Sequence, residues 1–102
     1  MPAPRLTPEE LERELATLPG WQFRDGRIER TYEFRDFVEA FAFMTAAALR
    51  IQEMDHHPEW SNVYGTVRVG LVTHDARGVT ARDTELARRL KALAARWPKK
   101  EI

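Results

Sequence analysis

The sequence predicts an α+β fold in which helices cover one face of a single antiparallel sheet. Two pairs of segments resemble β-hairpins, and the segments before, between and after them have helical periodicity. The resulting order is helix, two strands, helix, two strands, helix, or α-β-β-α-β-β-α. Hairpins separated by helices favour an antiparallel sheet with helices on one face, but they leave the order of the strands open.

The first helix is predicted to begin after Thr7. Thr7 is the expected N-cap, Pro8 suits the first helical position, and Glu10 completes a capping box. Pro19-Gly20 is expected to end the helix. Its apolar stripe consists of Leu11, Leu15 and Leu18.

The first hairpin is predicted at Asp25-Gly26, because this dipeptide between two alternating segments favours a tight turn. The strands are expected around residues 21–24 and 27–32. The pairs expected to share a face within each strand are Trp21 with Phe23 and Ile28 with Tyr32.

A long second helix is predicted after Asp36, which is the expected N-cap. It should end near Asp55, because Pro58 disfavours helical geometry at His57. Its apolar positions at helical spacing are Phe37, Phe41, Met44, Ala48 and Ile51.

The second hairpin is predicted around Trp60–Val63 and Val67–Thr73, with Gly65 in or near the turn. A loop over residues 75–78 should lead to the third helix. Thr80 as N-cap and Asp83 at the third helical position form a second capping box. The third helix is expected to bury Leu86, Leu90, Leu93 and Trp97, to end at Pro98 and to be followed by a solvated tail.

Length and composition fit one domain over residues 1–102 and limit the function classes. Lys plus Arg equals Asp plus Glu at 16 each, which argues against a general binder of nucleic acid. The absence of cysteine excludes disulfides, thiolate nucleophiles and Cys-ligated zinc. No apolar run is long enough to span a membrane, and the first residues do not resemble a signal peptide. We therefore expect a cytoplasmic protein.

The three histidines, His56, His57 and His74, lie within nineteen positions and at the ends of predicted elements. Three imidazoles could bind zinc. However, adjacent histidines do not point together in a regular helix or strand, and zinc motifs more often place one helical turn between ligands. Acid–base catalysis without a metal is therefore favoured, since imidazole exchanges protons readily near neutral pH.

Pro58 would restrict the geometry of the His56–His57 corner, and Asp83 could orient an imidazole. Simpler structural interpretations exist. His57 could be a packed or surface residue, Asp83 a capping acid, and Trp60 a sheet residue. The residues expected to form only a solvated face of the last helix are Arg82, Arg88, Arg89 and Lys91.

A series of motifs follows the second predicted helix: His56-His57-Pro58-Glu59-Trp60, Asn62-Val63-Tyr64, then Val67, Val69, Leu71 and Thr73-His74, and Gly78-Val79-Thr80-Ala81-Arg82-Asp83 with Leu86-Ala87. With these motifs, the segment from Asp55 to Leu86 resembles the pterin-4a-carbinolamine dehydratase family. The resemblance extends more loosely over the whole chain, although the stretch where family members often carry a carboxylate reads Gln52-Glu53 here.

The resemblance implies a four-stranded antiparallel sheet with three helices packed on one face, in a homodimer or homotetramer. It implies that His56, His57 and His74 surround a pterin, that Asp83 supports the site, and that Pro58 and Trp60 shape it. The implied activity is dehydration of 4a-hydroxytetrahydropterin to quinonoid dihydropterin, as in tetrahydrobiopterin recycling, with no cofactor. Our hypothesis is that His56 and His74 are the acid–base pair and that His57 mainly binds; which one is the acid stays open.

Two other functions compete with this lyase activity. Some relatives act as dimerisation cofactors for a transcription factor, so the chain could be a protein-binding module. It could also handle a pterin for another purpose, such as a role near molybdopterin enzymes. The complete set of three histidines favours the enzyme.

Overall fold

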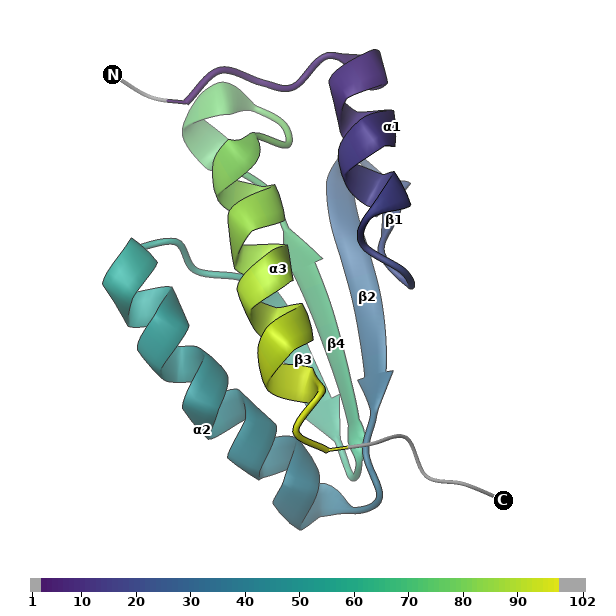
Figure 1. Ribbon diagram of the computed structural model, residues 1–102. Helices are drawn as coiled ribbons and strands as arrows, with labels where there is room; N and C mark the ends of the chain where they lie inside the picture. Colours follow the sequence, from purple (N-terminus) through teal and green to yellow (C-terminus); the bar gives the residue numbers. More distant parts are fainter. Residues whose placement is uncertain (1–2, 98–102) are drawn as a thin grey trace.

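The computed structural model describes residues 3–97. The chain folds into one sheet and three helices, and Figure 1 shows the helices on the same side of the sheet. The predicted order α-β-β-α-β-β-α is confirmed, with one added 3-10 turn, η1, before the last helix. The elements are α1 (Pro8–Ala16), β1 (Gln22–Arg24), β2 (Arg27–Glu33), α2 (Phe37–Met54), β3 (Glu59–Val63), β4 (Thr66–Leu71), η1 (His74–Ala76) and α3 (Ala81–Ala94).

The four strands pair in the order β1-β2-β4-β3, and every pairing is antiparallel. The second hairpin is therefore inserted so that β4, its later strand, lies in the centre beside β2. Ile28 and Tyr32 of β2 stand opposite Leu71 and Val67 of β4, and all four are buried. This register places the alternating apolar residues of both central strands on the face that the helices cover.

All three predicted N-caps are confirmed. Thr7 and Thr80 each form a complete capping box, with Glu10 and Asp83 as the reciprocal acids. Asp36 accepts from the backbone N–H of Glu39. The predicted hairpin turn at Asp25-Gly26 is also present, and both residues have positive φ angles, 54° and 81°. Local capping and turn chemistry therefore determines where these elements begin.

The prediction for the apolar face of α2 is wrong in part. Phe37, Phe41 and Ala48 are exposed, Met44 is half-buried, and only Ile51 of the expected set is buried. The positions that face the core are Ala40, Phe43, Ala47 and Ile51. The helix is apolar around most of its circumference, so periodicity alone does not select a face; packing against the sheet and α3 does.

Smaller differences occur at element ends. Leu18 and Trp97 lie beyond their helices, but Leu18 is buried and Trp97 packs against the core. Strand β4 ends at Leu71, and Thr73 continues only as an isolated bridge to Gly78. Trp21 is buried just before β1, whereas Phe23 is half-exposed. The expected helix stop at Pro98 and the tail after it lie outside the described residues.

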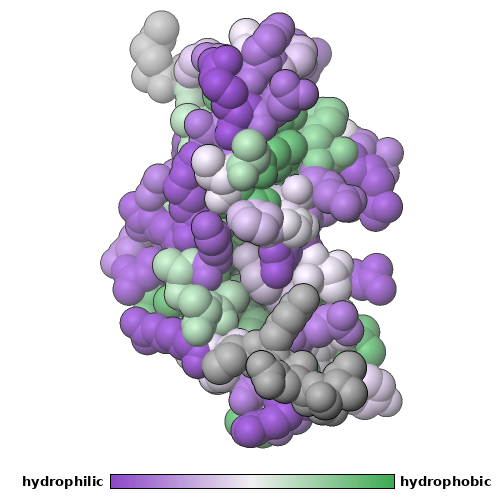
Figure 2. All heavy atoms as spheres, turned by 45° about the vertical axis from the view of Figure 1, so that its right-hand side comes forward, coloured by the Kyte–Doolittle hydropathy of each residue, from purple (hydrophilic) through white to green (hydrophobic). Residues whose placement is uncertain are grey.

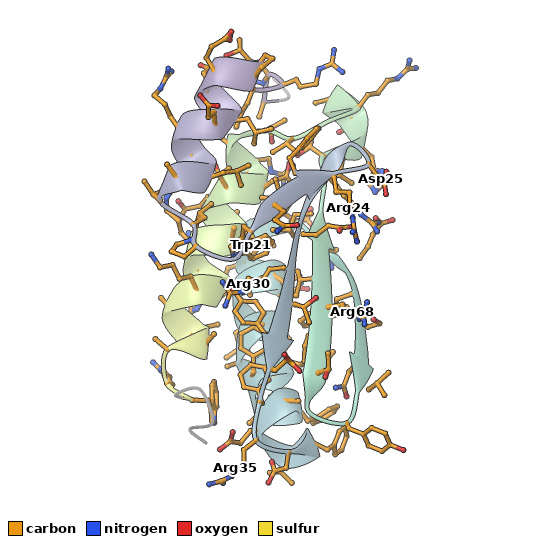
Figure 3. All side chains as sticks on the ribbon, turned by 90° about the vertical axis from the view of Figure 1, so that its right-hand side faces the viewer. Trp21, Arg24, Asp25, Arg30, Arg35 and Arg68 are labelled. Atoms are coloured by element: carbon orange, nitrogen blue, oxygen red, sulfur yellow. The ribbon has the colours of Figure 1, made fainter. Side chains whose placement is uncertain are left out.

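The other face of the sheet is polar. Figure 3 shows Arg24 and Arg68 on the side away from the helices and Trp21 on the helix side. Arg27 of β2 reaches across β4 and pairs with Glu59 of β3 at 2.7 Å, and it also holds Glu29 at 2.8 Å. The Arg27 guanidinium lowers the pKa of Glu29. Gly70 of β4 lies beneath Arg27, and a Cβ there would come within 3.2 Å of its side chain.

Tyr32 should make stability fall in alkaline solution. Burial raises the pKa of Tyr32, although the Arg30 guanidinium over its ring opposes the shift. Above about pH 10 the unfolded chain releases a proton that the folded chain keeps, so the free energy of unfolding must decrease as pH rises. Urea unfolding on both sides of that pH measures the slope.

Tyr32→Phe should reduce this slope, and Tyr64→Phe, which removes the hydroxyl of an exposed tyrosine, is the matched control. At neutral pH Tyr32→Phe should leave stability unchanged or higher, because the buried hydroxyl lacks a partner among the described residues. An equal alkaline slope in wild type and Tyr32→Phe would contradict the assignment.

No helix in the described part of the chain is both long and apolar enough to cross a bilayer.

Candidate active site

The histidine-rich segments meet where two helix ends lie together. Helices α2 and α3 run antiparallel side by side, so the C-terminus of α2 lies beside the N-terminus of α3 (Figure 1). Asp55 ends α2 in a left-handed conformation with φ 49°. The chain then turns into His56, which is buried against the first turn of α3.

Asp83 is the centre of this contact. Its side chain is fully buried, and both carboxylate oxygens are used. Oδ2 accepts from the Thr80 backbone N–H at 2.9 Å and from the Thr73 hydroxyl at 2.8 Å. Oδ1 lies 2.5 Å from His56 Nε2. One residue therefore both caps α3 and holds an imidazole, which combines the two roles considered from the sequence.

The hydrogen-bond directions follow from the donors present. Thr80 Oγ1 accepts from the backbone N–H of Arg82 and lies 2.8 Å from Thr73 Oγ1. Because the Thr73 hydroxyl donates to Asp83, the Thr80 hydroxyl donates to Thr73. A carboxylate only accepts, so the hydrogen between Asp83 and His56 lies on Nε2. This arrangement leaves Nδ1 as the His56 nitrogen free for other contacts.

The other two histidines are exposed. His74 begins η1 directly after Thr73, so it is joined to the Asp83 network through its neighbour. His57 follows His56, and its Nε2 lies 3.5 Å from Asp55 Oδ1. The structure thus brings His56 into direct contact with Asp83 and places His57 and His74 on segments attached to the same network.

Pro58 and Trp60 lie on the segment that leaves this corner. Pro58 is half-buried between His57 and the start of β3. Trp60 is half-buried, stands opposite Val69 of β4 and packs against the core. Neither residue hydrogen-bonds Asp83 through a described atom.

The interpretation of Arg82 as part of a solvated face is wrong. Arg82 is half-buried, and its guanidinium donates to the carbonyls of Met54 and Asp55 at the end of α2. Thr73, which donates to Asp83, is another residue of the site for which the sequence predicts no role. The sequence does contain a sign of this contact. Arg82 lies two residues after the predicted N-cap Thr80, so its side chain is close to any element that packs against the start of α3.

No three His, Asp or Glu side chains within residues 3–97 stand close enough together to hold a metal ion. The metal-free character of the site stays a prediction.

A separate groove of about 680 Å³ lies between α1, β1 and the loop after η1. Its lining is largely apolar and includes Leu11, Leu15, Phe23 and Val79, with Arg5 and Arg77 also present. Figure 2 shows green, apolar atoms between hydrophilic ones in the upper half of this side of the molecule. The three histidines do not line this groove.

The fold and site define a class of small α+β proteins that hold a buried His–Asp pair where two antiparallel helices meet. Residues 4–93 match the family model described as pterin 4 alpha carbinolamine dehydratase. This match spans most of the chain, so the chain belongs to that family.

Relatives agree with this assignment. A Rhodopseudomonas palustris protein provisionally named a pterin-4-alpha-carbinolamine dehydratase is 57% identical over 89% of this chain and 92% of its own length. A Bradyrhizobium diazoefficiens protein with the same provisional name is 55% identical over 94% and 98%. A Brucella melitensis crystal structure, described as a transcriptional coactivator/pterin dehydratase, has a TM-score of 0.85 and 49% identity, covering 88% of this chain and 98% of that one.

Proposed function

We propose that this chain dehydrates 4a-hydroxytetrahydropterin to quinonoid dihydropterin, using histidines and no metal. The observation that carries the proposal is the buried contact between His56 Nε2 and Asp83 Oδ1 at 2.5 Å. Family membership supplies the substrate class, and this contact supplies an imidazole with a fixed orientation.

The reaction requires two proton transfers on neighbouring atoms of the pterin. The bond between C4a and the hydroxyl oxygen breaks, and its electron pair leaves with the oxygen. A protonated imidazole donates a proton to that oxygen, which leaves as water. The N5 proton passes to a neutral imidazole, and the N5–H electron pair forms the C4a=N5 double bond. No oxidant or reductant takes part, and a proton exchange between the histidines and solvent restores the site.

The contacts support His56 as the base and His74 as the acid. Asp83 fixes the hydrogen on His56 Nε2 and leaves Nδ1 to accept the N5 proton. The imidazolium that forms is then stabilised by the buried carboxylate. His74 is exposed and can exchange its proton with solvent between turnovers. His57, also exposed beside His56, contributes to pterin binding, and Pro58 and Trp60 shape the frame.

The testing experiment follows dehydration of 4a-hydroxytetrahydropterin by absorbance, after treatment with a chelator. The wild type should accelerate the reaction, and His74→Ala should lower the rate at least about 10²-fold, as expected for the loss of a general acid. His57→Ala, which removes an adjacent exposed imidazole, should mainly raise KM.

A folded wild type that does not accelerate dehydration would refute the proposed activity. Loss of the rate on chelation would refute its metal-free character. Full activity in His74→Ala would refute the role assigned to His74.

We also propose that the chain is a homodimer or homotetramer. Four large apolar side chains of α2 are more than half exposed, and apolar area of this kind on one helix favours association. They are Phe37, Val38, Phe41 and Leu49.

The same surface favours protein binding as a second candidate function, since the Brucella melitensis neighbour is described as a transcriptional coactivator as well as a dehydratase. Sedimentation measures the oligomer size, and it also shows whether a partner displaces a subunit. We further propose that the protein is located in the cytoplasm and that residues 1–102 belong to one domain.

A further inference from the structure

Arg82 links the start of α3 to the end of α2 at the point where the histidine segment begins. A single guanidinium nitrogen, Nη2, donates to the Met54 carbonyl at 3.0 Å and to the Asp55 carbonyl at 2.9 Å. Met54 is the last residue of α2, and Asp55 is its left-handed C-cap. Arg82 therefore holds the two peptide groups that directly precede His56.

The end of α2 needs such a partner. The last carbonyls of a helix have no intrahelical donors, and a cation near them is favourable. The last turn of α2 contains no basic residue. Asp55 adopts a left-handed conformation, which aspartate tolerates better than most residues other than glycine, and the hydrogen bonds from Arg82 hold the two carbonyls of this turn. Arg82 supplies two hydrogen bonds and a positive charge at this turn.

Adjacent residues of α3 hold adjacent parts of the histidine segment. Asp83 fixes the ring of His56 through Nε2, and Arg82 fixes the backbone just before it. The ring hydrogen bond alone leaves the imidazole able to tilt about it. A second attachment on the backbone that carries the ring restricts this tilt, and so narrows the directions in which Nδ1 can point.

We propose that Arg82 is a positioning residue that aims His56 Nδ1 at the pterin by clamping the Met54 and Asp55 carbonyls. This inference rests on the proposed dehydratase function for its effect on rate, but the positioning itself is independent of that function. Since displacement of a reacting group by about 1 Å can cost about 10²-fold, loss of the clamp should slow catalysis without removing any catalytic group.

The test compares R82M, R82K and R88M. R82M keeps the apolar stem but loses the charge and donors, whereas R82K keeps the charge without the planar donor group. R88M is the matched control, because Arg88 also joins α3 to another helix, through Glu14 of α1, but does not touch the histidine segment. The readouts are kcat, KM and the ¹H–¹⁵N resonances of the histidine rings, recorded where urea unfolding shows each variant to be folded.

We expect R82M to lower kcat about 10- to 100-fold with a smaller change in KM, and to shift or broaden the His56 ring resonances. R82K should recover part of the loss, and it also serves as the test if R82M does not fold. R88M should keep the wild-type rate and spectrum. An unchanged His56 spectrum in R82M, an unchanged kcat, or an equal loss in R88M would overturn the proposal. If the wild type itself has no dehydratase activity, the proposed function fails, while the spectrum still decides whether Arg82 positions His56.

Discussion

Asp83→Asn should reduce the dehydration rate by about 10³- to 10⁴-fold while the protein stays folded, similar to the loss of the orienting carboxylate in a catalytic triad. The backbone N–H of Thr80 donates to Oδ2, so the oxygen of the new amide will occupy that position. Its NH₂ group then lies where Oδ1 contacts His56 Nε2. An N–H facing Nε2 forces that nitrogen to accept, so the imidazole hydrogen moves to Nδ1. The nitrogen assigned as the base is then blocked.

The experiment measures the initial rate and the ¹⁵N shifts of the His56 ring, which report which nitrogen carries hydrogen. Asp25→Asn is the matched control, because it makes the same change of charge in an exposed hairpin turn whose left-handed conformation asparagine tolerates. The N-cap Thr80 is unchanged, and the amide oxygen of the new residue can still accept from the Thr80 backbone N–H, so α3 should persist in the Asp83 variant. A rate near that of the wild type, or an Nε2 that keeps its hydrogen, would contradict the mechanism.

Phe43→Ala should give the largest loss of stability among substitutions in α2, about 3–5 kcal/mol. Phe43 is fully buried. Its ring centroid lies 5.1 Å from that of Tyr32, 5.0 Å from that of Phe34 and 6.4 Å from that of Trp97. Truncation of Phe43 to alanine removes the favourable free energy of burying its ring and the aromatic contacts that the ring makes. It also leaves a cavity between β2 and α2.

Phe41→Ala provides a matched control on the same helix, because Phe41 is 55% exposed. Its cost should be much smaller. Urea unfolding at two protein concentrations separates folding from association, which matters if the exposed face of α2 joins subunits. Equal losses in the two variants would contradict the assignment of the buried face.

The comparison of Phe43 with Phe41 also shows where sequence patterning is insufficient. Both residues lie in an apolar helix, and the spacing favoured the set that includes Phe41. The structure buries the neighbouring set, because the sheet and α3 contact α2 from that side. Periodicity identifies one face only where the opposite face is polar.

The candidate site divides in the same way. Its histidines and Asp83 were identifiable from residue type, spacing and family resemblance, and the capping role of Asp83 followed from Thr80 three residues earlier. The contact between Asp83 and His56 spans 27 positions, and that between Arg82 and Asp55 also spans 27. The spacing of residues along the chain does not reveal contacts between residues so far apart in sequence. Sequence patterning therefore places Arg82 on the solvated face of its helix.

By itself, the sequence determined the order of the elements, their N-caps, the Asp25-Gly26 turn and the set of histidines. These features depend on interactions between residues a few positions apart, so local residue identity is sufficient to specify them. Only the tertiary structure decided that β4 lies beside β2, that α2 buries Phe43, and that Arg82 clamps the turn before His56. These features depend on which distant surfaces meet, and several pairings compatible with the same pattern compete until the core packs as a whole.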